Sequence, residues 1–434
     1  MSTAPTPPPP ELPPAMQPAP GLPRWGLLAL FTAAFTAVMT ELLPAGLLPR
    51  MSEDLRVTQG RVGFLVTGYA AASFLAAIPL TTALRGLPRR PVLVGVLLGF
   101  ALCNTVTALS SSYALTFGAR LLAGATGGLL WAMLAGYAAR MVPAERRGRA
   151  MAIVLAGITV ALCAGIPAGT ALAAALGWRV AFASLAVLSV VLVAWVLLKV
   201  PRFPGEPAAE RPPLRRIATL PGIRSVLLVT LFLLLGHQTM YTYMSPLAER
   251  AGIGNAGPVL LVFGVAAVAG IWTVGVLVDR HLRPALLTAL ALIAAATLLI
   301  GLLGQAPAAL IVAAAVWGAA FGGAPTLLQT ALVDISGPAH ADVATALQAT
   351  VYNIGIAVGS LTGGIVLEGA GVGDLPWTAL PLIAAALATT WAARRIGHRD
   401  RRIKGGPESA RSQPSPLLHL CARDLASEHD GPPR

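Results

Sequence analysis

The chain has 434 residues, of which 56% are hydrophobic and only 11% are charged. A soluble domain carries about 25% charged residues, so this composition excludes a water-soluble fold. The net charge of +13 does not indicate a nucleic-acid-binding protein, because the arginines stand in short loops between apolar runs and not on one basic face. The three cysteines form no CxxC or Cys/His pattern, which argues against structural zinc, any other metal site and disulfides.

A proline-rich segment, residues 1–23, opens the chain. It contains no lysine or arginine and lacks the short apolar core of a signal peptide, so we expect a disordered N-terminal tail. A first half, residues 24–199, follows with six apolar runs. Each run is close to or above the ~20 residues that cross ~30 Å of hydrocarbon. The expected helices lie at about 25–48, 60–84, 91–109, 113–141, 149–176 and 178–199.

Residues 200–222 form a long polar stretch inside the chain, rich in proline and arginine. This composition predicts a cytoplasmic linker. A second half, residues 223–396, has six further apolar runs, and the polar residues 397–434 predict a disordered cytoplasmic tail. The second set of expected helices lies at about 223–246, 257–279, 285–304, 308–334, 342–368 and 375–395.

Arginine and lysine are distributed unevenly between the loops that join these helices. One set of alternating loops holds fifteen of them, and the other set holds five. Positive residues accumulate on the cytoplasmic side of membrane proteins, so the asymmetry predicts that both termini are cytoplasmic. The even number of helices agrees with that orientation. We therefore expect a multi-pass protein of the cell inner (plasma) membrane.

The two halves share landmarks at a single offset of 195 residues. A parallel duplication of this kind places the substrate path between the halves, near the bilayer midplane. The prediction is an all-α membrane protein with twelve transmembrane helices in two pseudo-symmetric six-helix halves. The matched features are Arg85 with Arg280, Gly127-Gly128 with Gly322-Gly323, Pro143 with Pro338, and Gly169 with Gly364.

Several motifs stand in a fixed order along the predicted helices. They are Glu41, Leu43-Pro44 and Glu53-Asp54 near the end of the first helix, Arg120 and Gly124 in the fourth, and Gly165, Pro167 and Gly169 in the fifth, followed by Gly177-Trp178-Arg179. Over about residues 25–395 these motifs resemble those of the major facilitator superfamily. Within it, they resemble drug/proton antiporters of the arabinose, purine-nucleoside and chloramphenicol exporter subgroup. The resemblance implies the major facilitator fold.

The resemblance also implies a secondary active transporter that exports a small molecule in exchange for protons by alternating access. No cofactor is expected, because the proton gradient supplies the energy. Few Asn, Gln, Asp or Arg residues are buried in the spans, which favours a small amphipathic or apolar compound, such as a drug or natural product. Export of a sugar, nucleoside or amino-acid-like metabolite is the alternative. The expected partners are the substrate, protons and the lipid bilayer, and we expect a monomer.

Three residues are candidates for proton coupling. Glu41 is the one acidic residue deep in an apolar span of the first half, where a charged group costs on the order of 2.5–3.5 kcal/mol. Arg120 lies at a similar depth, about 10 Å from the extracellular end of its helix, so the two side chains could pair. His237 falls within one residue of the repeat equivalent of Glu41. A neutral packed carboxyl and a purely structural histidine are the alternatives.

Pro44 breaks the hydrogen-bonding pattern at the end of the first helix. Proline has no N–H, so a carbonyl near Thr40 should lack its usual helical partner. The resulting bend either serves gating or only ends the helix. Polar and aromatic residues in other apolar spans are candidates for the substrate cavity: Trp131, Gln238, Tyr241, Tyr243, Gln329, Gln348 and Asn353.

Gating residues are expected after the second helix of each half. The superfamily pattern there is Gly-x-Leu-x-Asp-Arg. The first half has Leu84 at the Asp position and keeps Arg85, Arg89 and Arg90, whereas the second half keeps Gly275, Asp279 and Arg280. Gly165, Pro167 and Gly169 should allow close helix contact and a kink. The alternatives are arginines that only set topology and glycines that serve general packing.

A membrane-embedded enzyme would need paired carboxylates or a His/Asp or Ser/His cluster at membrane depth. Of the six histidines, only His237 lies in a predicted span, and no such cluster accompanies it. We therefore expect a transporter and not an enzyme. A channel or a receptor is disfavoured, because duplicated halves with a single buried acid suit alternating access.

Overall fold

The computed structural model describes residues 22–84, 86–143, 146–205, 222–336 and 341–393, and the described helices belong to one compact unit. Side chains at a few helical positions, among them 275–280, lie outside the description. Within the described ranges there are helices and turns but no strands. Twelve helical stretches there are long and apolar enough to cross a membrane. The predicted all-α fold is confirmed.

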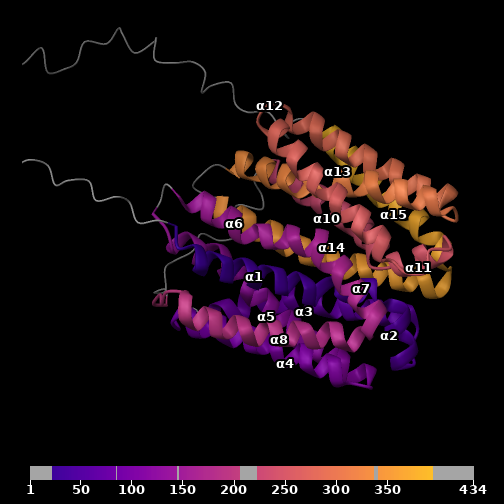
Figure 1. The fold of residues 1–434 in the computed structure, drawn as a ribbon. Coiled ribbons are helices and arrows are strands. Elements are labelled where there is room, and N and C mark those ends of the chain that lie inside the picture. The colour runs from indigo at the N-terminus through magenta and orange to yellow at the C-terminus, as the bar shows by residue number, and fades with distance from the viewer. Residues whose placement is uncertain (1–21, 85, 144–145, 206–221, 337–340, 394–434) are drawn as a thin grey trace, which may run out of the picture. The chain divides into compact units, whose positions relative to one another are not determined.

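Within its described ranges, the first half consists of six bilayer-length spans, one of which is made of α6, η3 and α7 together, and the short helix α2. Long runs of Ala, Leu and Val become helical in a bilayer because a helix satisfies its own backbone hydrogen bonds. Its elements are α1 (Arg24–Leu42), η1 (Leu43–Gly46), α2 (Leu48–Leu55), α3 (Gln59–Leu84), α4 (Arg89–Leu109), α5 (Tyr113–Arg140), α6 (Arg147–Val160), η3 (Ala161–Gly165), α7 (Ile166–Leu176) and α8 (Trp178–Lys199). Helix α4 packs against α5 and α8, and α1 packs against α6 (Figure 1).

The second half repeats this plan. Its elements are α10 (Ile223–Tyr241), α11 (Met244–Arg250), α12 (Gly257–Leu303), α13 (Pro307–Ser336), α14 (Ala341–Gly369), η5 (Val372–Asp374) and α15 (Leu375–Ala392). Helix α10 packs against α14 and α15, and α12 packs against α13. The halves contact each other through α3 with α14 and through η3 and α7 with α12.

Two helices differ from the sequence-based expectation. The first was expected to continue to residue 48, but α1 ends at Leu42 and a short 3-10 turn containing Pro44 follows. The fifth contains a π turn at η3, which ends two residues before Pro167. The two helices expected at 257–279 and 285–304 both lie within α12, where they meet at a kink with non-helical backbone angles at His281 (φ −135°, ψ 37°), and each contains its own candidate membrane span.

The bundle has two ends that can be told apart by their elements. We call the end where α1 begins and α15 finishes the tail end, and the opposite end, where α2 and α11 lie, the α2 end (Figure 1). At the α2 end Ser245 donates a hydrogen bond of 3.1 Å to the carbonyl of Ala45. Thr58 also donates a hydrogen bond to Glu368 there. These bonds join the first half to the second.

The predicted duplication appears as one packing contact made twice. In the first half a methyl group added to Gly124 or Gly128 would meet main-chain atoms of α3. In the second half a methyl group added to Gly318 or Gly322 would meet main-chain atoms of α12. Small residues of this kind let membrane helices approach closely. Gly128 and Gly322, one from each matched Gly-Gly pair, therefore hold equivalent helices together in the two halves, at an offset of 194 residues, one less than the offset found in the sequence.

Candidate functional site

The break after α1 creates the first polar feature of the site. Pro44 has no N–H, so the carbonyl of Thr40 cannot receive the hydrogen bond that a continuous helix would give it. Arg120 of α5 supplies the missing donor: its Nη1 donates to the Thr40 carbonyl. Its Nη2 donates to the Glu41 carbonyl at 2.7 Å. Only 1% of the Arg120 side chain is exposed, so a buried guanidinium completes the broken helix.

Neighbouring helices hold Arg120 and the break in place. Arg120 Nε donates to the Leu65 carbonyl of α3 at 3.3 Å, and its Cζ lies 4.8 Å from the centroid of the Tyr69 ring. Asn104 of α4 donates to the hydroxyl of Thr40 at 3.0 Å. Tyr69 and Asn104 are not among the residues selected from the sequence. Asn104 could have been found as the lone amide in the apolar run of α4.

Glu41 is buried at the same place, with 6% of its side chain exposed. Its Oε1 has no hydrogen-bond partner, and within the described residues no ion pair joins its carboxylate to Arg120. Arg120 therefore contacts the main chain of Glu41 and not its carboxyl group. Buried polar atoms in native proteins nearly always have partners, so each exception points to a functional role or an unseen partner.

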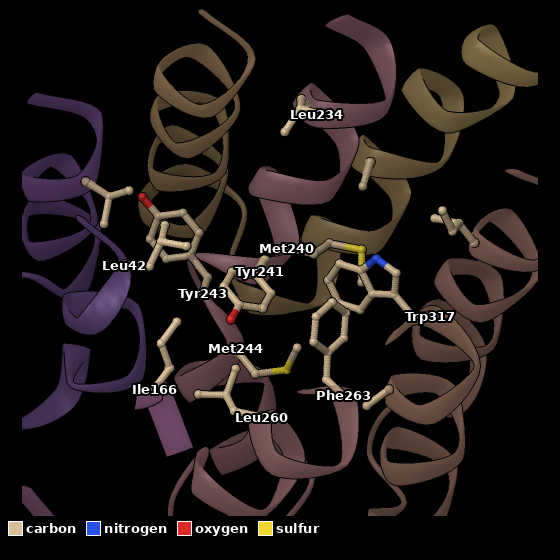
Figure 2. Packing of buried hydrophobic residues seen from close by; sticks show 14 of the residues in the cluster. Leu42, Ile166, Leu234, Met240, Tyr241, Tyr243, Met244, Leu260, Phe263 and Trp317 are labelled. Carbon is tan, nitrogen blue, oxygen red and sulfur yellow. The ribbon is translucent and has the colours of Figure 1, made fainter. Parts of the chain in front are cut away.

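His237 of α10 lies in an aromatic cluster of the second half. Its ring stacks on Phe321 with centroids 3.6 Å apart and stacks on Tyr241 at 5.0 Å, and Trp317 meets it edge-on at 5.1 Å. Figure 2 shows Tyr241, Trp317 and Phe263 gathered in the same packed region. Neither Nδ1 of His237 nor Nε1 of Trp317 has a hydrogen-bond partner. The described contacts of His237 are therefore to aromatic rings.

The other cavity candidates divide between α10 and more distant helices. Gln238 accepts a hydrogen bond of 3.3 Å from Thr242, and the hydroxyl of Tyr243 donates to the Ser360 carbonyl of α14 at 2.8 Å. On α14, Gln348 is buried and its Nε2 has no partner, whereas Asn353 donates to the carbonyl of Ala349 in its own helix. Trp131 is half-buried on α5, and Gln329 is exposed on α13. The structure places Gln238 and Tyr241 beside His237 on α10, and Tyr243 in the turn that follows this helix.

The expected gating residues are only partly described. Arg85 lies outside the described residues. At Gly275, Asp279 and Arg280 only the helical backbone is described. Arg89 and Arg90 begin α4. Gly165 and Gly169, which flank Pro167, allow close contact with the first membrane span. A methyl group at Gly165 would lie 2.6 Å from Met39 Sδ, and one at Gly169 would lie 2.7 Å from Leu43 Cδ1. The two glycines therefore bring η3 and α7 against that span.

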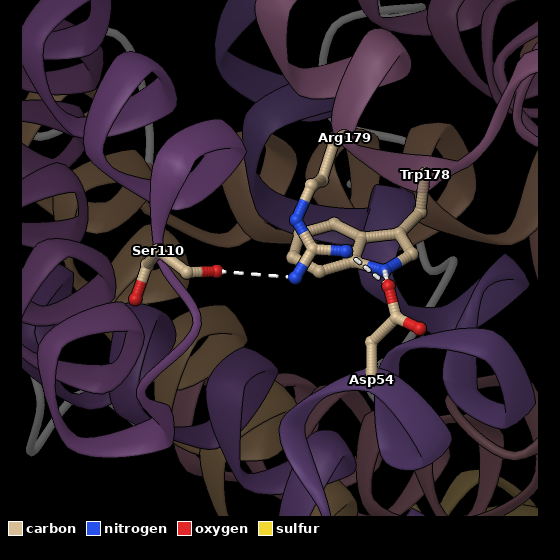
Figure 3. Close-up of polar contacts among 4 residues, drawn as sticks. All are labelled: Asp54, Ser110, Trp178 and Arg179. Atoms are coloured by element: carbon tan, nitrogen blue, oxygen red, sulfur yellow. Dashed lines mark hydrogen bonds and ion pairs between the residues drawn. The ribbon is translucent and has the colours of Figure 1, made fainter.

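Two sequence motifs that were far apart meet at the α2 end (Figure 3). Asp54 of α2 accepts a hydrogen bond of 2.9 Å from Trp178 Nε1 and forms an ion pair with Arg179, which also donates to the Ser110 carbonyl at 3.4 Å. Gly177 precedes them with φ +92°, a backbone angle that favours glycine. Burial alone would raise the pKa of Asp54, but the bonds from Trp178 and Arg179 outweigh it and lower that pKa.

Two hollows border the contact between the halves. A lateral groove of about 1730 Å³ runs between α7 and α12, and it is lined by uncharged residues such as Ala168, Leu261 and Trp272. Glu41 is not among its lining residues, several of which are exposed apolar side chains such as Val265. A smaller pocket of about 590 Å³ lies at the α2 end, where Thr58 and Glu368 are among its lining residues. Among the described residues, no three His, Cys, Asp or Glu side chains are close enough to hold a metal ion.

Bilayer-length helices in two similar halves, with a buried acid and a buried arginine at a helix break, define a membrane transport protein. The chain belongs to the Major Facilitator Superfamily, whose family model matches residues 30–280 and 256–427. The predicted family is therefore confirmed. The protein is a multi-pass membrane transporter of the efflux type, because its curated relatives are efflux or resistance proteins of this superfamily.

Three relatives illustrate the similarity. A chloramphenicol resistance protein of Streptomyces lividans is 34% identical over a region that covers 85% of this chain and 96% of that protein. The purine ribonucleoside efflux pump NepI of Escherichia coli (strain K12) is 29% identical, with 81% and 89% covered. A probable sugar efflux transporter of Mannheimia succiniciproducens is 25% identical, with 83% and 91% covered.

Solved structures share the fold at low sequence identity. A bacterial homolog of the human lysosomal transporter Spinster, in an inward-facing and occupied conformation, has a TM-score of 0.65 and 17% identity, with 86% of this chain and 97% of that chain covered. The human organic anion transporter MFSD10 has a TM-score of 0.62 and 18% identity, with 86% and 100% covered. These likenesses establish the fold alone.

Proposed function

We propose that the protein exports a small amphipathic or apolar compound, a drug or natural product, in exchange for protons by alternating access. The observation that carries this proposal is the buried carboxyl of Glu41, whose Oε1 lacks a partner beside the guanidinium of Arg120. A carboxyl that gains and loses a proton inside the membrane can couple proton movement to a change in the surrounding helices. No resident cofactor is needed for this step.

The coupling depends on two alternative sets of partners for Arg120. With Glu41 protonated, the guanidinium bonds the main-chain carbonyls of Thr40 and Glu41, as in this structure. Loss of the proton creates a carboxylate within reach of the same guanidinium, and a charge-assisted bond to it competes with the bonds to the carbonyls. Releasing those carbonyls loosens the break before Pro44. The proton thereby changes how α1 is held against α3 and α5.

The aromatic cluster of the second half supports the proposed substrate class. The cluster around His237 offers aromatic faces, among them Phe321 and Trp317, and few charged groups. Such surroundings suit an apolar or mixed compound with a planar group. A nucleoside or sugar is the second candidate, favoured by the relatives described as a purine ribonucleoside efflux pump and a probable sugar efflux transporter.

We place the tail end in the cytoplasm and the α2 end outside. The loops at the tail end hold fifteen of the arginines and lysines counted above, against five at the α2 end. Positive residues near the ends of membrane helices remain on the cytoplasmic side. Both termini would then be cytoplasmic, in the inner membrane of a bacterial cell.

Glu41→Gln tests the proposal, because glutamine keeps the shape of the side chain but cannot titrate. In a host without its own efflux pumps, a resistance panel that includes chloramphenicol and a toxic purine nucleoside identifies the probe. Export of that probe is then measured in inverted vesicles, together with proton release from the purified protein. We expect Glu41→Gln to lose accumulation against a gradient. Glu53→Gln, which neutralises an exposed acid on α2, is the matched control. Full export by Glu41→Gln would show that another group couples the proton.

A further inference from the structure

Helices α3 and α14 meet at the α2 end through a tyrosine held between two glycines. Tyr243 lies in the break between α10 and α11. A methyl group added to Gly364 of α14 would lie 2.6 Å from the Tyr243 hydroxyl oxygen, and one added to Gly63 of α3 would also meet that hydroxyl. The hydroxyl donates to the Ser360 carbonyl at 2.8 Å. The ring therefore fills the space where the two halves touch.

A second contact lies about one helical turn nearer the α2 end. A methyl group added to Gly60 of α3 would lie 2.7 Å from Cγ of Glu368, so the Glu368 side chain crosses directly over the start of α3. The hydroxyl of Thr58 donates to Oε1 of Glu368 and accepts the N–H of Arg61 at 3.3 Å. Thr58 immediately precedes the first residue of α3. A carboxylate is favoured there, because the free N–H groups of a helix start attract negative charge.

We propose that Glu368 is a positioning residue of the transport cycle, and that its bond to Thr58 closes the α2 end of the path between the halves. Residues 58 and 368 belong to different halves, so the bond must break before the α2 end opens. Tyr243 forms the deeper layer of the same closure. The inference rests on alternating access in the proposed function, but it needs neither proton coupling by Glu41 nor a particular substrate.

A reporter cysteine at Ser245 measures opening of this end directly. Ser245 is 2% exposed and bonds the Ala45 carbonyl of the other half, so Ser245→Cys reacts with a bulky, membrane-impermeant maleimide only when the halves separate there. The background replaces Cys103, Cys163 and Cys421 with alanine. Labelling is followed over time in right-side-out spheroplasts and in inverted vesicles, without any substrate.

We expect Glu368→Ala and Thr58→Val each to raise the labelling rate in spheroplasts by about tenfold or more. This is the effect on a two-state equilibrium of losing one hydrogen bond to a charged group. Glu249→Ala is the matched control, because Glu249 is an exposed acid of the same pocket on α11. Unchanged labelling in both test variants would overturn the proposal, as would a rise confined to inverted vesicles.

A reversible crosslink supplies an independent test. The β-carbons of cysteines at positions 60 and 368 would lie within about 4.2 Å of each other, since a C–C bond is about 1.5 Å long, and this separation suits a disulfide. In Gly60→Cys/Glu368→Cys, oxidation should abolish export of the probe that the resistance panel identifies, and reduction should restore it. The two single variants should not respond to oxidation. Export through the oxidised crosslink would refute closure at this point. If the protein without these substitutions exports no compound of the panel, the proposed function is wrong. The test of closure by Ser245→Cys labelling does not depend on that outcome.

Discussion

Arg120→Lys tests whether one guanidinium holds the break in the first membrane span. Arg120 donates at once to the carbonyls of Thr40, Glu41 and Leu65. Pro44 cannot replace the bond to Thr40, because it has no N–H. Lysine keeps the positive charge, but its ammonium is a point donor and cannot reach across two carbonyls as a planar fork does. The substitution therefore separates the fork from the charge.

The expected loss follows from the number and length of these bonds. A bond from a charged donor contributes about 1.5–3 kcal/mol, and bonds between membrane helices average about 0.6 kcal/mol with a maximum of about 1.7 kcal/mol. Lysine retains one of the two short bonds, and the bond to Leu65 is long at 3.3 Å. We therefore expect Arg120→Lys to lower the free energy of unfolding by about 1–3 kcal/mol, and Arg120→Leu by about 2–5 kcal/mol.

The measurement is denaturant unfolding of the purified protein in detergent, with parent and variants under the same conditions. Arg61→Lys is the matched control, because Arg61 is exposed near the start of α3 and a surface change of this kind alters stability by less than about 0.5 kcal/mol. If Arg120→Lys and Arg61→Lys unfold alike, the fork does not hold the break. The account of the helix end at Pro44 would then be wrong.

Three further outcomes are expected. Gly124→Ala should cost about 1–3 kcal/mol of unfolding free energy, because its methyl group would meet a main-chain carbonyl, whereas Gly118→Ala, which faces open space, should be neutral or stabilising. Asp54→Asn should destabilise by less than about 1 kcal/mol at neutral pH, since its ion pair is partly exposed. Because the native pKa of Asp54 is below 3.8, that difference should fade as pH drops through the lowered value. Reporter fusions after Arg211 and Ala251 should face opposite sides of the membrane; the same side for both would refute the topology.

Composition and periodicity alone determined the fold of this chain. Hydrocarbon about 30 Å thick requires helices of about 20 apolar residues, so twelve such runs predicted twelve spans without any knowledge of their packing. The 195-residue offset predicted two equivalent halves, and Gly128 and Gly322, which are 194 residues apart, make the same kind of main-chain contact in each. The missing N–H of Pro44 also predicted an unpaired carbonyl near Thr40, because that loss is covalent and needs no tertiary information.

Helix rotation and partner choice were decided only by the tertiary structure. Depth along the axes placed Glu41 and Arg120 at one level, but depth does not say which atoms meet, and Arg120 reaches the main chain of Glu41. Tyr69, which stacks on Arg120, gave no sequence pattern, because a tyrosine in an apolar run looks the same on any face of its helix. The bond between Thr58 and Glu368 spans 310 residues. Such pairs depend on how the two halves pack, and a sequence read along one dimension does not contain that geometry.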